Sequence, residues 1–121
     1  MTEGEGRLEV VAAAVELDRL GLNHGSAGNV SLRQGDLVLI TPSGAPSAEL
    51  RPEAIASMPL GGPDGAYEGP LAPSSEWRFH LDVYRARRDV NAVVHMHSTY
   101  ATTLAALRRE IPAVHYMIAA F

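Results

Sequence analysis

The stretch AVVHMHST, residues 92–99, places two histidines one residue apart within an apolar run. Side chains alternate between the two faces of a strand, so His95 and His97 share one face with Val93, and the alternate apolar side chains share the other. We therefore expect a strand over 91–97. Its apolar face is expected to be the core face, and its histidine face is a candidate site.

Two imidazoles at this spacing on a strand lie a few ångströms apart. Their neutral nitrogens can both bind one divalent cation. Burial without a metal would disfavour the protonated rings and would require a hydrogen-bond partner for each of them. Because an H-x-H pattern is common, a metal pair and a pair of hydrogen-bonded or half-exposed histidines both remain open from this motif alone.

The segments on either side of this stretch divide into helices and strands by the periodicity of their apolar residues. The expected elements are a helix over 6–20, a hairpin that turns at 34–36, a short helical turn near 52–55, a helix over 75–88 capped by Ser74, a helix after Ser98 that ends before Pro112, and a strand over 113–121. A mixture of helices and strands in 121 residues predicts one α/β domain, 1–121.

Composition narrows the class of protein. The net charge is −4 and charges of both signs are interspersed, which argues against nucleic acid as a partner. No apolar run approaches the roughly 18 residues that span a bilayer, and the start lacks the pattern of a signal peptide. The chain has no cysteine, which fits a cytoplasmic protein and leaves His, Asp, Glu and carbonyl oxygen as metal ligands.

Three segments rich in Gly, Ser or Asn have the chemistry of anion-binding turns. Glu76 follows Ser74 and Ser75 at the start of a predicted helix, where free N–H groups and the helix dipole favour negative charge. TPSG, residues 41–44, and GSAGNVS, residues 25–31, each combine hydroxyls with a glycine that allows close backbone approach. Each segment alone is also typical of an ordinary turn or cap, but together they indicate a small phosphorylated substrate.

Five motifs along the chain resemble, in order and approximate spacing, those of the class II aldolase and adducin family. They are GLNHGSAGNVSLR, LITPSG, PSSEWRFHLDVY, NAVVHMHSTYATT and IPAVHYMIAAF. The resemblance implies a three-layer α/β fold with a central, mainly antiparallel sheet flanked by helices, of which this chain represents the N-terminal part. Members of the family differ in activity, so fold and function need separate arguments.

The resemblance also implies roles for individual residues. His95 and His97 are expected to bind Zn²⁺, or another divalent cation such as Mn²⁺ or Co²⁺. Glu76 is expected to act as acid and base and to approach the metal when substrate is absent. Tyr116 resembles a tyrosine that reaches the site of a neighbouring subunit in a homotetramer and assists proton transfer at the aldehyde oxygen. The residues that match the family's phosphate site are Gly28, Asn29, Ser43, Gly44, Ser74 and Ser75.

The activity implied by the resemblance is that of a metal-dependent aldolase. It would cleave L-fuculose 1-phosphate, or a similar ketose phosphate, to dihydroxyacetone phosphate and L-lactaldehyde. The alternatives on the same scaffold are an L-ribulose-5-phosphate 4-epimerase, a methylthioribulose-phosphate dehydratase and an adducin-like binding module without catalysis. The intact histidine pair and Glu76 favour an enzyme over the binding module.

A catalytic zinc usually has three protein ligands, and the family's third histidine would fall beyond the last residue of this sequence. His80 lies four residues after Glu76 on the same helical face, so a site made of Glu76, His80, His95 and His97 is an alternative. His115 is expected to be structural, on the strand face away from Tyr116. The apolar ending MIAAF leads us to expect a fragment of a longer protein.

Overall fold

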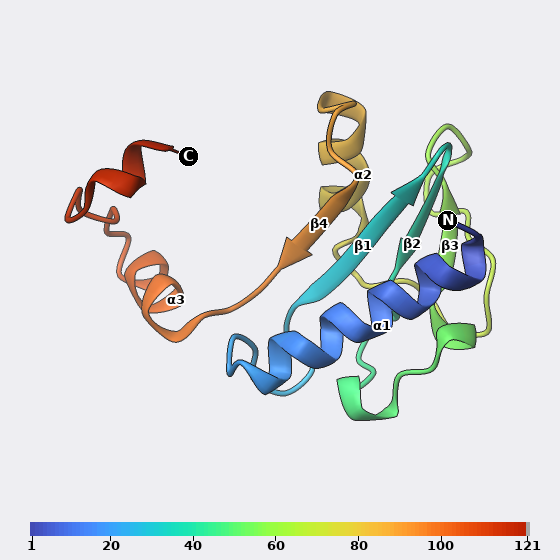
Figure 1. The fold of residues 1–121 in the computed structure, drawn as a ribbon, viewed down its shortest axis with the longest axis horizontal. Helices are drawn as coiled ribbons and strands as arrows, with labels where there is room; N and C mark the ends of the chain where they lie inside the picture. The colour runs from blue at the N-terminus through green and yellow to red at the C-terminus, as the bar shows by residue number, and fades with distance from the viewer. Residues whose placement is uncertain (121) are drawn as a thin grey trace.

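The computed structural model describes residues 1–120 and centres on an antiparallel sheet with the strand order β3-β2-β1-β4 (Figure 1). The strands are β1 (Asn29–Gln34), β2 (Leu37–Ile40), β3 (Ala56–Pro59) and β4 (Ala92–His95). The predicted hairpin is confirmed, because β1 and β2 pair with Gln34 opposite Leu37 across a two-residue turn. Gly35 has φ 59° in that turn, a conformation that hairpins of this length favour.

Helix α1 (Glu3–Arg19) covers one face of the sheet (Figure 1). It begins three residues before the predicted start at 6, because Thr2 and Glu5 form a capping box. Thr2 Oγ1 accepts a hydrogen bond from the Glu5 N–H at 3.2 Å, and the Thr2 N–H donates to Glu5 Oε2 at 2.6 Å. The buried residues of this layer are Val10, Leu17, Val30, Leu39 and Ile55.

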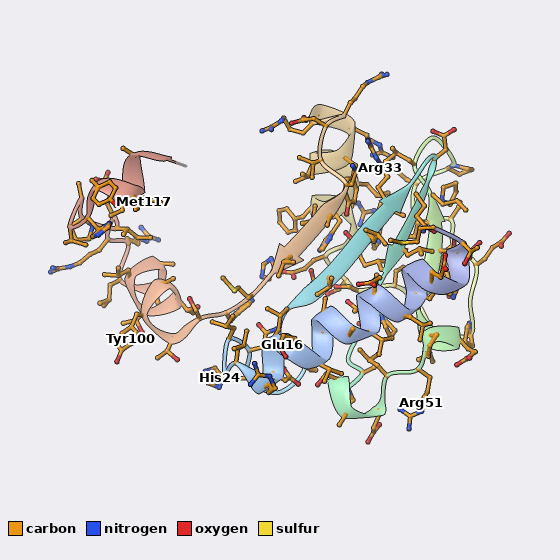
Figure 2. All side chains as sticks on the ribbon, viewed as in Figure 1. Glu16, His24, Arg33, Arg51, Tyr100 and Met117 are labelled. Atoms are coloured by element: carbon orange, nitrogen blue, oxygen red, sulfur yellow. The ribbon has the colours of Figure 1, made fainter. Side chains whose placement is uncertain are left out.

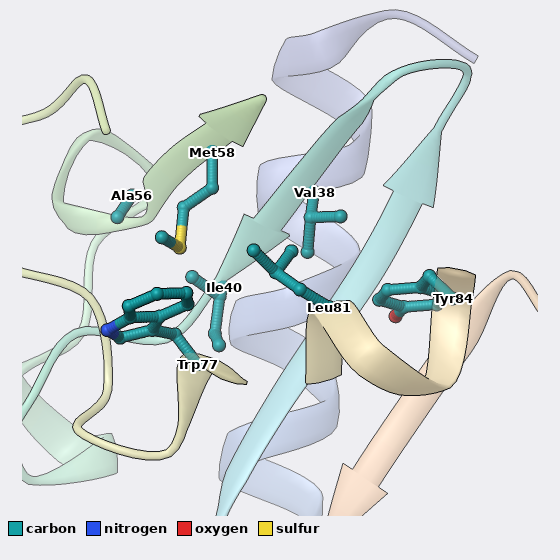
Figure 3. Packing of buried hydrophobic residues seen from close by; sticks show 7 residues of the cluster. All are labelled: Val38, Ile40, Ala56, Met58, Trp77, Leu81 and Tyr84. Atoms are coloured by element: carbon teal, nitrogen blue, oxygen red, sulfur yellow. The ribbon is translucent and has the colours of Figure 1, made fainter. Parts of the chain in front are cut away.

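Helix α2 (Trp77–Ala86) covers the opposite face of the sheet (Figure 3). It is shorter than the predicted helix over 75–88. The buried cluster between helix and sheet consists of Val38, Ile40, Ala56, Met58, Trp77, Leu81 and Tyr84. Full burial of side chains of this size stabilises the fold by about 1.5–3 kcal/mol each. With α1 on one face and α2 on the other, the predicted three-layer α/β arrangement is confirmed.

The connection between β2 and β3 contains two short 3₁₀ helices, η1 (Ser47–Glu49) and η2 (Pro52–Ala54). The second confirms the helical turn predicted near 52–55. Among residues 1–120, no helix has both the length and the apolar character needed to cross a bilayer.

The C-terminal segment departs from the sequence prediction. Helix α3 (Thr99–Ala106) is present as predicted, but the strand predicted over 113–121 is wrong for residues 116–120, which form the 3₁₀ helix η3 (Tyr116–Ala120). A strand needs a neighbouring strand for its hydrogen bonds, whereas this segment closes a local bond from the Ile118 N–H to the His115 carbonyl at 3.1 Å. Both helices lie apart from the sheet (Figure 1). Phe121 lies outside the described residues.

The two faces of β4 are also exchanged relative to the prediction. Val94 and Met96, expected in the core, are 51% and 47% exposed, whereas Val93 packs against the cluster under α2. The register explains the difference. Val94 lies opposite Val30 on the face that α1 covers, but β4 is an edge strand, and α1 packs on β1, β2 and the two 3₁₀ helices η1 and η2.

Candidate metal and phosphate site

The pairing of β1 with β4 brings the histidine pair to the centre of the candidate site. Asn29 lies opposite His95, and paired residues of an antiparallel ladder project from the same face. His95 Nε2 and His97 Nε2 are 2.8 Å apart, with the ring centroids 4.9 Å apart and the planes tilted by 43°. The sequence predicted this convergence. A contact that it did not predict comes from Asn23, whose Oδ1 accepts a hydrogen bond from the His97 N–H at 3.1 Å.

Glu76 lies beside the histidine pair. Its Oε2 accepts a hydrogen bond from Asn29 Nδ2 at 2.6 Å and is 3.6 Å from His95 Nε2. The prediction that Ser74 caps the helix, with Glu76 in its first turn, is wrong by two residues. Glu76 is itself the N-cap, and Ser74 Oγ accepts a bond from the Glu76 N–H at 3.3 Å. This position turns the carboxylate toward β1 and β4.

The segments predicted to bind phosphate surround one cavity of about 210 Å³. Hydrogen bonds between their backbones hold them together, since the Ser74 N–H donates to the Thr41 carbonyl at 2.9 Å and the Ser43 N–H donates to the Ala72 carbonyl at 3.0 Å. The lining residues are Ser26, Ala27, Gly28, Asn29, Pro42, Ser43, Gly44, Ser74, Ser75, Glu76 and His97. All six residues proposed for phosphate therefore meet at one place, next to Glu76 and one imidazole.

Gly28 allows the segment 25–31 to turn. Its φ is 87°, and an added Cβ would collide with the Asn23 side chain. Since Asn23 also holds the His97 backbone, this glycine allows the cavity wall and the histidine strand to approach each other.

His80 is not placed as a metal ligand, contrary to the alternative drawn from its spacing. The ring is 1% exposed, and both of its nitrogens are occupied. Nδ1 is 2.6 Å from Ser31 Oγ, and Nε2 contacts Asn29 Oδ1. Burial lowers the pKa of His80 from 6.5 to about 4, so the ring is neutral at pH 7.

The donor set at His95 and His97 fits a divalent cation. Neutral imidazole nitrogens with a neighbouring carboxylate are ligand types that zinc prefers. Within residues 1–120, however, no group of three or more His, Cys, Asp or Glu side chains is arranged to hold a metal ion. This part of the chain therefore contributes two imidazoles, with Glu76 as the nearest carboxylate.

Tyr116 and the remaining histidines are not brought to this cavity. Tyr116 is 80% exposed, and its ring stacks on that of His115 at a centroid distance of 4.5 Å, whereas opposite faces were expected for these two residues. His24 Nε2 contacts Thr99 Oγ1 at 3.3 Å, at the start of α3.

Three residues that support the site were missed by the sequence analysis. Asn23 gave no signal beyond its place in a polar turn. Ser31 and Tyr84 surround His80, and the spacing of Glu76, His80 and Tyr84 along α2 could have indicated a polar stripe on one helix face.

Fold and site together define an α/β domain with a candidate metal and anion site at one edge of its sheet. Residues 8–121 match the family model described as Class II Aldolase and Adducin N-terminal domain. The chain belongs to this family, as its motifs predicted.

Several relatives resemble the chain over about half of their own length. The 5-methylthioribulose-1-phosphate/5-deoxyribulose-1-phosphate aldolase of Rhodospirillum rubrum is 52% identical over 91% of this chain and 48% of that protein. The L-fuculose phosphate aldolase of Escherichia coli K12 is 47% identical over 93% of this chain and 51% of that protein. A solved structure of an L-fuculose 1-phosphate aldolase superposes with a TM-score of 0.87 at 40% identity, covering 95% of this chain and 54% of that one.

Proposed function

We propose that the protein is a divalent-metal-dependent aldolase that cleaves a ketose 1-phosphate to dihydroxyacetone phosphate and an aldehyde. The observation that carries the proposal is that two imidazoles and a carboxylate lie together beside a cavity lined by Gly and Ser, with His97 and Glu76 in its wall. The names of the relatives specify substrates of this chemical class. The candidate substrates are L-fuculose 1-phosphate, which would yield L-lactaldehyde, 5-deoxyribulose 1-phosphate and 5-methylthioribulose 1-phosphate.

His95 and His97 would hold the cation, with Zn²⁺ as the first candidate and Mn²⁺ or Co²⁺ as substitutes. When bound, the cation supplies the positive charge that stabilises an enediolate, which is worth several kcal/mol in reactions of this type. His95 is the last residue of β4 and His97 lies just beyond it; both are half-buried, and their Nε2 atoms are 2.8 Å apart. The hydrogen bond from the His97 backbone to Asn23 keeps the second ring in place.

Glu76 is proposed to move the proton at carbon 3 of the sugar. Cleavage breaks the bond between carbons 3 and 4, the hydroxyl on carbon 4 loses its proton as the aldehyde forms, and carbon 3 gains a proton from the Glu76 carboxyl. In the reverse direction the carboxylate removes that proton. Tyr116 of a neighbouring subunit is proposed to relay the hydroxyl proton, accepting it on the phenol oxygen while its own proton passes to water, since its side chain is 80% exposed on this chain.

The phosphate group is proposed to occupy the cavity formed by the Gly and Ser segments. Hydroxyls and backbone N–H groups fix the substrate without reacting with it, which orients carbon 3 toward Glu76. The lining residues proposed for this role are Gly28, Asn29, Ser43, Gly44, Ser74 and Ser75.

The proposal is tested by exchange of a carbon 3 hydrogen of dihydroxyacetone phosphate with deuterated water, followed by NMR without any aldehyde. Wild-type protein, expressed from its full coding sequence, should catalyse this exchange. Glu76→Gln should slow it by roughly 10²- to 10⁴-fold with phosphate affinity unchanged. The control is Glu53→Gln, an exposed acid on η2, which should leave the rate unchanged. An unchanged rate in Glu76→Gln would remove this residue from the mechanism.

A second test concerns the metal pair. His95→Ala should abolish binding of Co²⁺, followed by its visible absorption, and should abolish exchange at the same time. His24→Ala is the control, because this exposed histidine contacts Thr99 and not the cavity. Full activity after exhaustive chelation would contradict a metal-dependent mechanism.

Product analysis separates the alternatives on the same scaffold. An aldolase releases an aldehyde, an epimerase inverts one hydroxyl of L-ribulose 5-phosphate, and a dehydratase releases water from methylthioribulose phosphate. An adducin-like module would bind no divalent cation at His95 and His97. We propose a cytoplasmic homotetramer with sites completed at subunit interfaces, and sedimentation at equilibrium measures that assembly state.

A further inference from the structure

A continuous row of buried hydrogen bonds leads from the core to Glu76. Tyr84 OH is 2.7 Å from Ser31 Oγ, which is 2.6 Å from His80 Nδ1. His80 Nε2 contacts Asn29 Oδ1, and Asn29 Nδ2 donates to Glu76 Oε2 at 2.6 Å. The first four of these side chains are buried, and the row comes from β1 on one side and α2 on the other.

The chemistry of the groups fixes the direction of every donor in this row. The amide oxygen of Asn29 only accepts, so His80 Nε2 carries the proton that it shares with Asn29. In a neutral imidazole Nδ1 is then bare and accepts from the Ser31 hydroxyl, which in turn accepts from Tyr84 OH. Burial lowers the pKa of His80 to about 4, which supports the neutral ring that this order requires.

We propose that His80, together with Ser31 and Tyr84, is a positioning residue that holds the Asn29 amide with its NH₂ group toward Glu76. This inference rests on the proposed function of Glu76 as the proton-transferring group. It assigns to His80 a task that is neither metal binding nor contact with substrate.

The energetic reason lies in the alternative orientation of the amide. Rotation of Asn29 by half a turn would place its Oδ1 against the Glu76 carboxylate, so that two acceptors would face each other without a proton between them. It would also set NH₂ against the His80 N–H, so that two donors would meet. The mismatch with His80 would be buried and the one with Glu76 partly buried, and an unpaired polar group is costly where water is excluded.

The row also explains why Asn29 is suited to this position. One N–H of its amide donates to Glu76, and its oxygen is used by His80. The second N–H remains for the cavity that Asn29 lines. Within residues 1–120 no buried side-chain nitrogen or oxygen lacks a partner, so removal of one member leaves its neighbour unsatisfied.

The first measurement is the tautomer of His80 by ¹⁵N NMR of the ring nitrogens, which needs no substrate and no metal. The chain has five histidines, and the spectrum of His80→Gln identifies the missing signals. We expect a proton on Nε2 and a bare Nδ1, which resonates far downfield of a protonated nitrogen. A proton on Nδ1 would overturn the inference, because the donor order would then be reversed.

The second measurement compares two variants of similar size and polarity. In His80→Gln the amide nitrogen can replace Nε2 and still donate to Asn29, whereas the shorter side chain of His80→Asn replaces only the Nδ1 end. We expect His80→Gln to keep most of the carbon 3 exchange rate, and His80→Asn to lower kcat roughly 10- to 100-fold with little change in KM. An equal decrease in kcat in both variants would show that His80 has a merely structural role and would overturn the inference.

Leu81→Ala is the matched control for stability, since Leu81 is the next residue of α2 and is buried in the apolar cluster under that helix without any hydrogen bond of its own in this row. It should lower the melting temperature without changing kcat. If His80→Asn does not fold, Ser31→Ala tests the same row, because loss of the hydroxyl removes the donor to Nδ1. Its kcat should fall, and an unchanged kcat would overturn the inference.

The outcomes separate this inference from the function on which it rests. A wild-type protein that exchanges no carbon 3 hydrogen contradicts the proposed function, and the His80 tautomer still decides the orientation of Asn29. An active protein in which His80→Gln and His80→Asn behave alike contradicts the inference and leaves the proposed function intact.

Discussion

At the scale of single residues, the site depends on side chains and glycines that contact no substrate. Gly28 is in contact with Asn23, which accepts a hydrogen bond from the His97 backbone. Asn29 is held by its hydrogen bond with His80. The sequence identified the residues with chemistry of their own, such as His95, because their pattern is local. It did not identify their supports, because contacts of the kind made by Asn23 join residues 74 positions apart.

Gly28→Ala should destabilise the protein by about 2 kcal/mol or more, since the left-handed conformation costs a non-glycine residue about 1–2 kcal/mol and a clash adds to that cost. The matched control is Gly35→Ala, where φ is 59° but an added Cβ meets nothing within 4 Å. Urea unfolding measures both variants. Only Gly28→Ala should also weaken phosphate binding. Equal destabilisation of the two variants would mean that the contact with Asn23 is unimportant.

The stability of the fold should depend on pH through His80. Burial lowers the pKa of His80 from 6.5 to about 4, so between these values the unfolded chain takes up a proton and the folded protein does not. The contribution of neutral His80 to the free energy of unfolding is therefore complete above pH 6.5. It is lost as the pH falls toward 4, which lowers the free energy of unfolding by up to about 3 kcal/mol.

Urea unfolding of the wild type and His80→Gln across this range isolates the effect, because every other titratable group is present in both proteins. The difference in the free energy of unfolding between them should shrink as the pH falls. If the free energies of unfolding of the two proteins changed in parallel with pH, the lowered pKa of His80 would be contradicted.

At the scale of elements, the type and order of the helices and of strands β1, β2 and β4 were predictable, whereas β3 was not predicted as a separate element and the ends and faces of the others were less predictable. Helix α1 follows from its apolar spacing, and its true start was encoded by Thr2 and Glu5 in a capping box. The faces of β4 could not be assigned from alternation alone. Alternation separates two faces, but which face is covered depends on the position of α1 and α2 across the sheet.

The two faces of β4 can be separated by a pair of identical substitutions. Val93→Ala should cost about 1–2 kcal/mol, because Val93 packs under α2, and Val94→Ala should cost less than about 0.5 kcal/mol in the unassembled chain. Loss of β propensity is the same in both, so the difference reports packing. Chemical denaturation measures it. A larger cost at Val94 in the unassembled chain would restore the face assignment made from the sequence.

At the scale of the whole molecule, the chain divides into a layered part and a segment that packs little against it. The sheet with α1 and α2 has two buried clusters, whereas α3 and η3 contain no buried residue among those described and lie apart from the sheet (Figure 2). The sequence predicted α3 because helices form by local contacts. It failed for residues 116–120, where a strand would have needed an edge to pair with.

Trypsin should cut the 121-residue chain first after Arg108 or Arg109. Both arginines are exposed, Arg108 has φ 54°, and the residues from 109 to 115 form no helix or strand, so the chain there fits a protease without unfolding a packed core. Mass spectrometry of early digests identifies the cut. Replacing both arginines by glutamine is the control and should delay digestion. A first cut after Arg33, inside the sheet, would contradict the division into a layered part and a segment that packs little against it. If assembly protects the same bonds, protection should rise with protein concentration, because contacts between copies would then cover the apolar side chains that α3 and η3 expose.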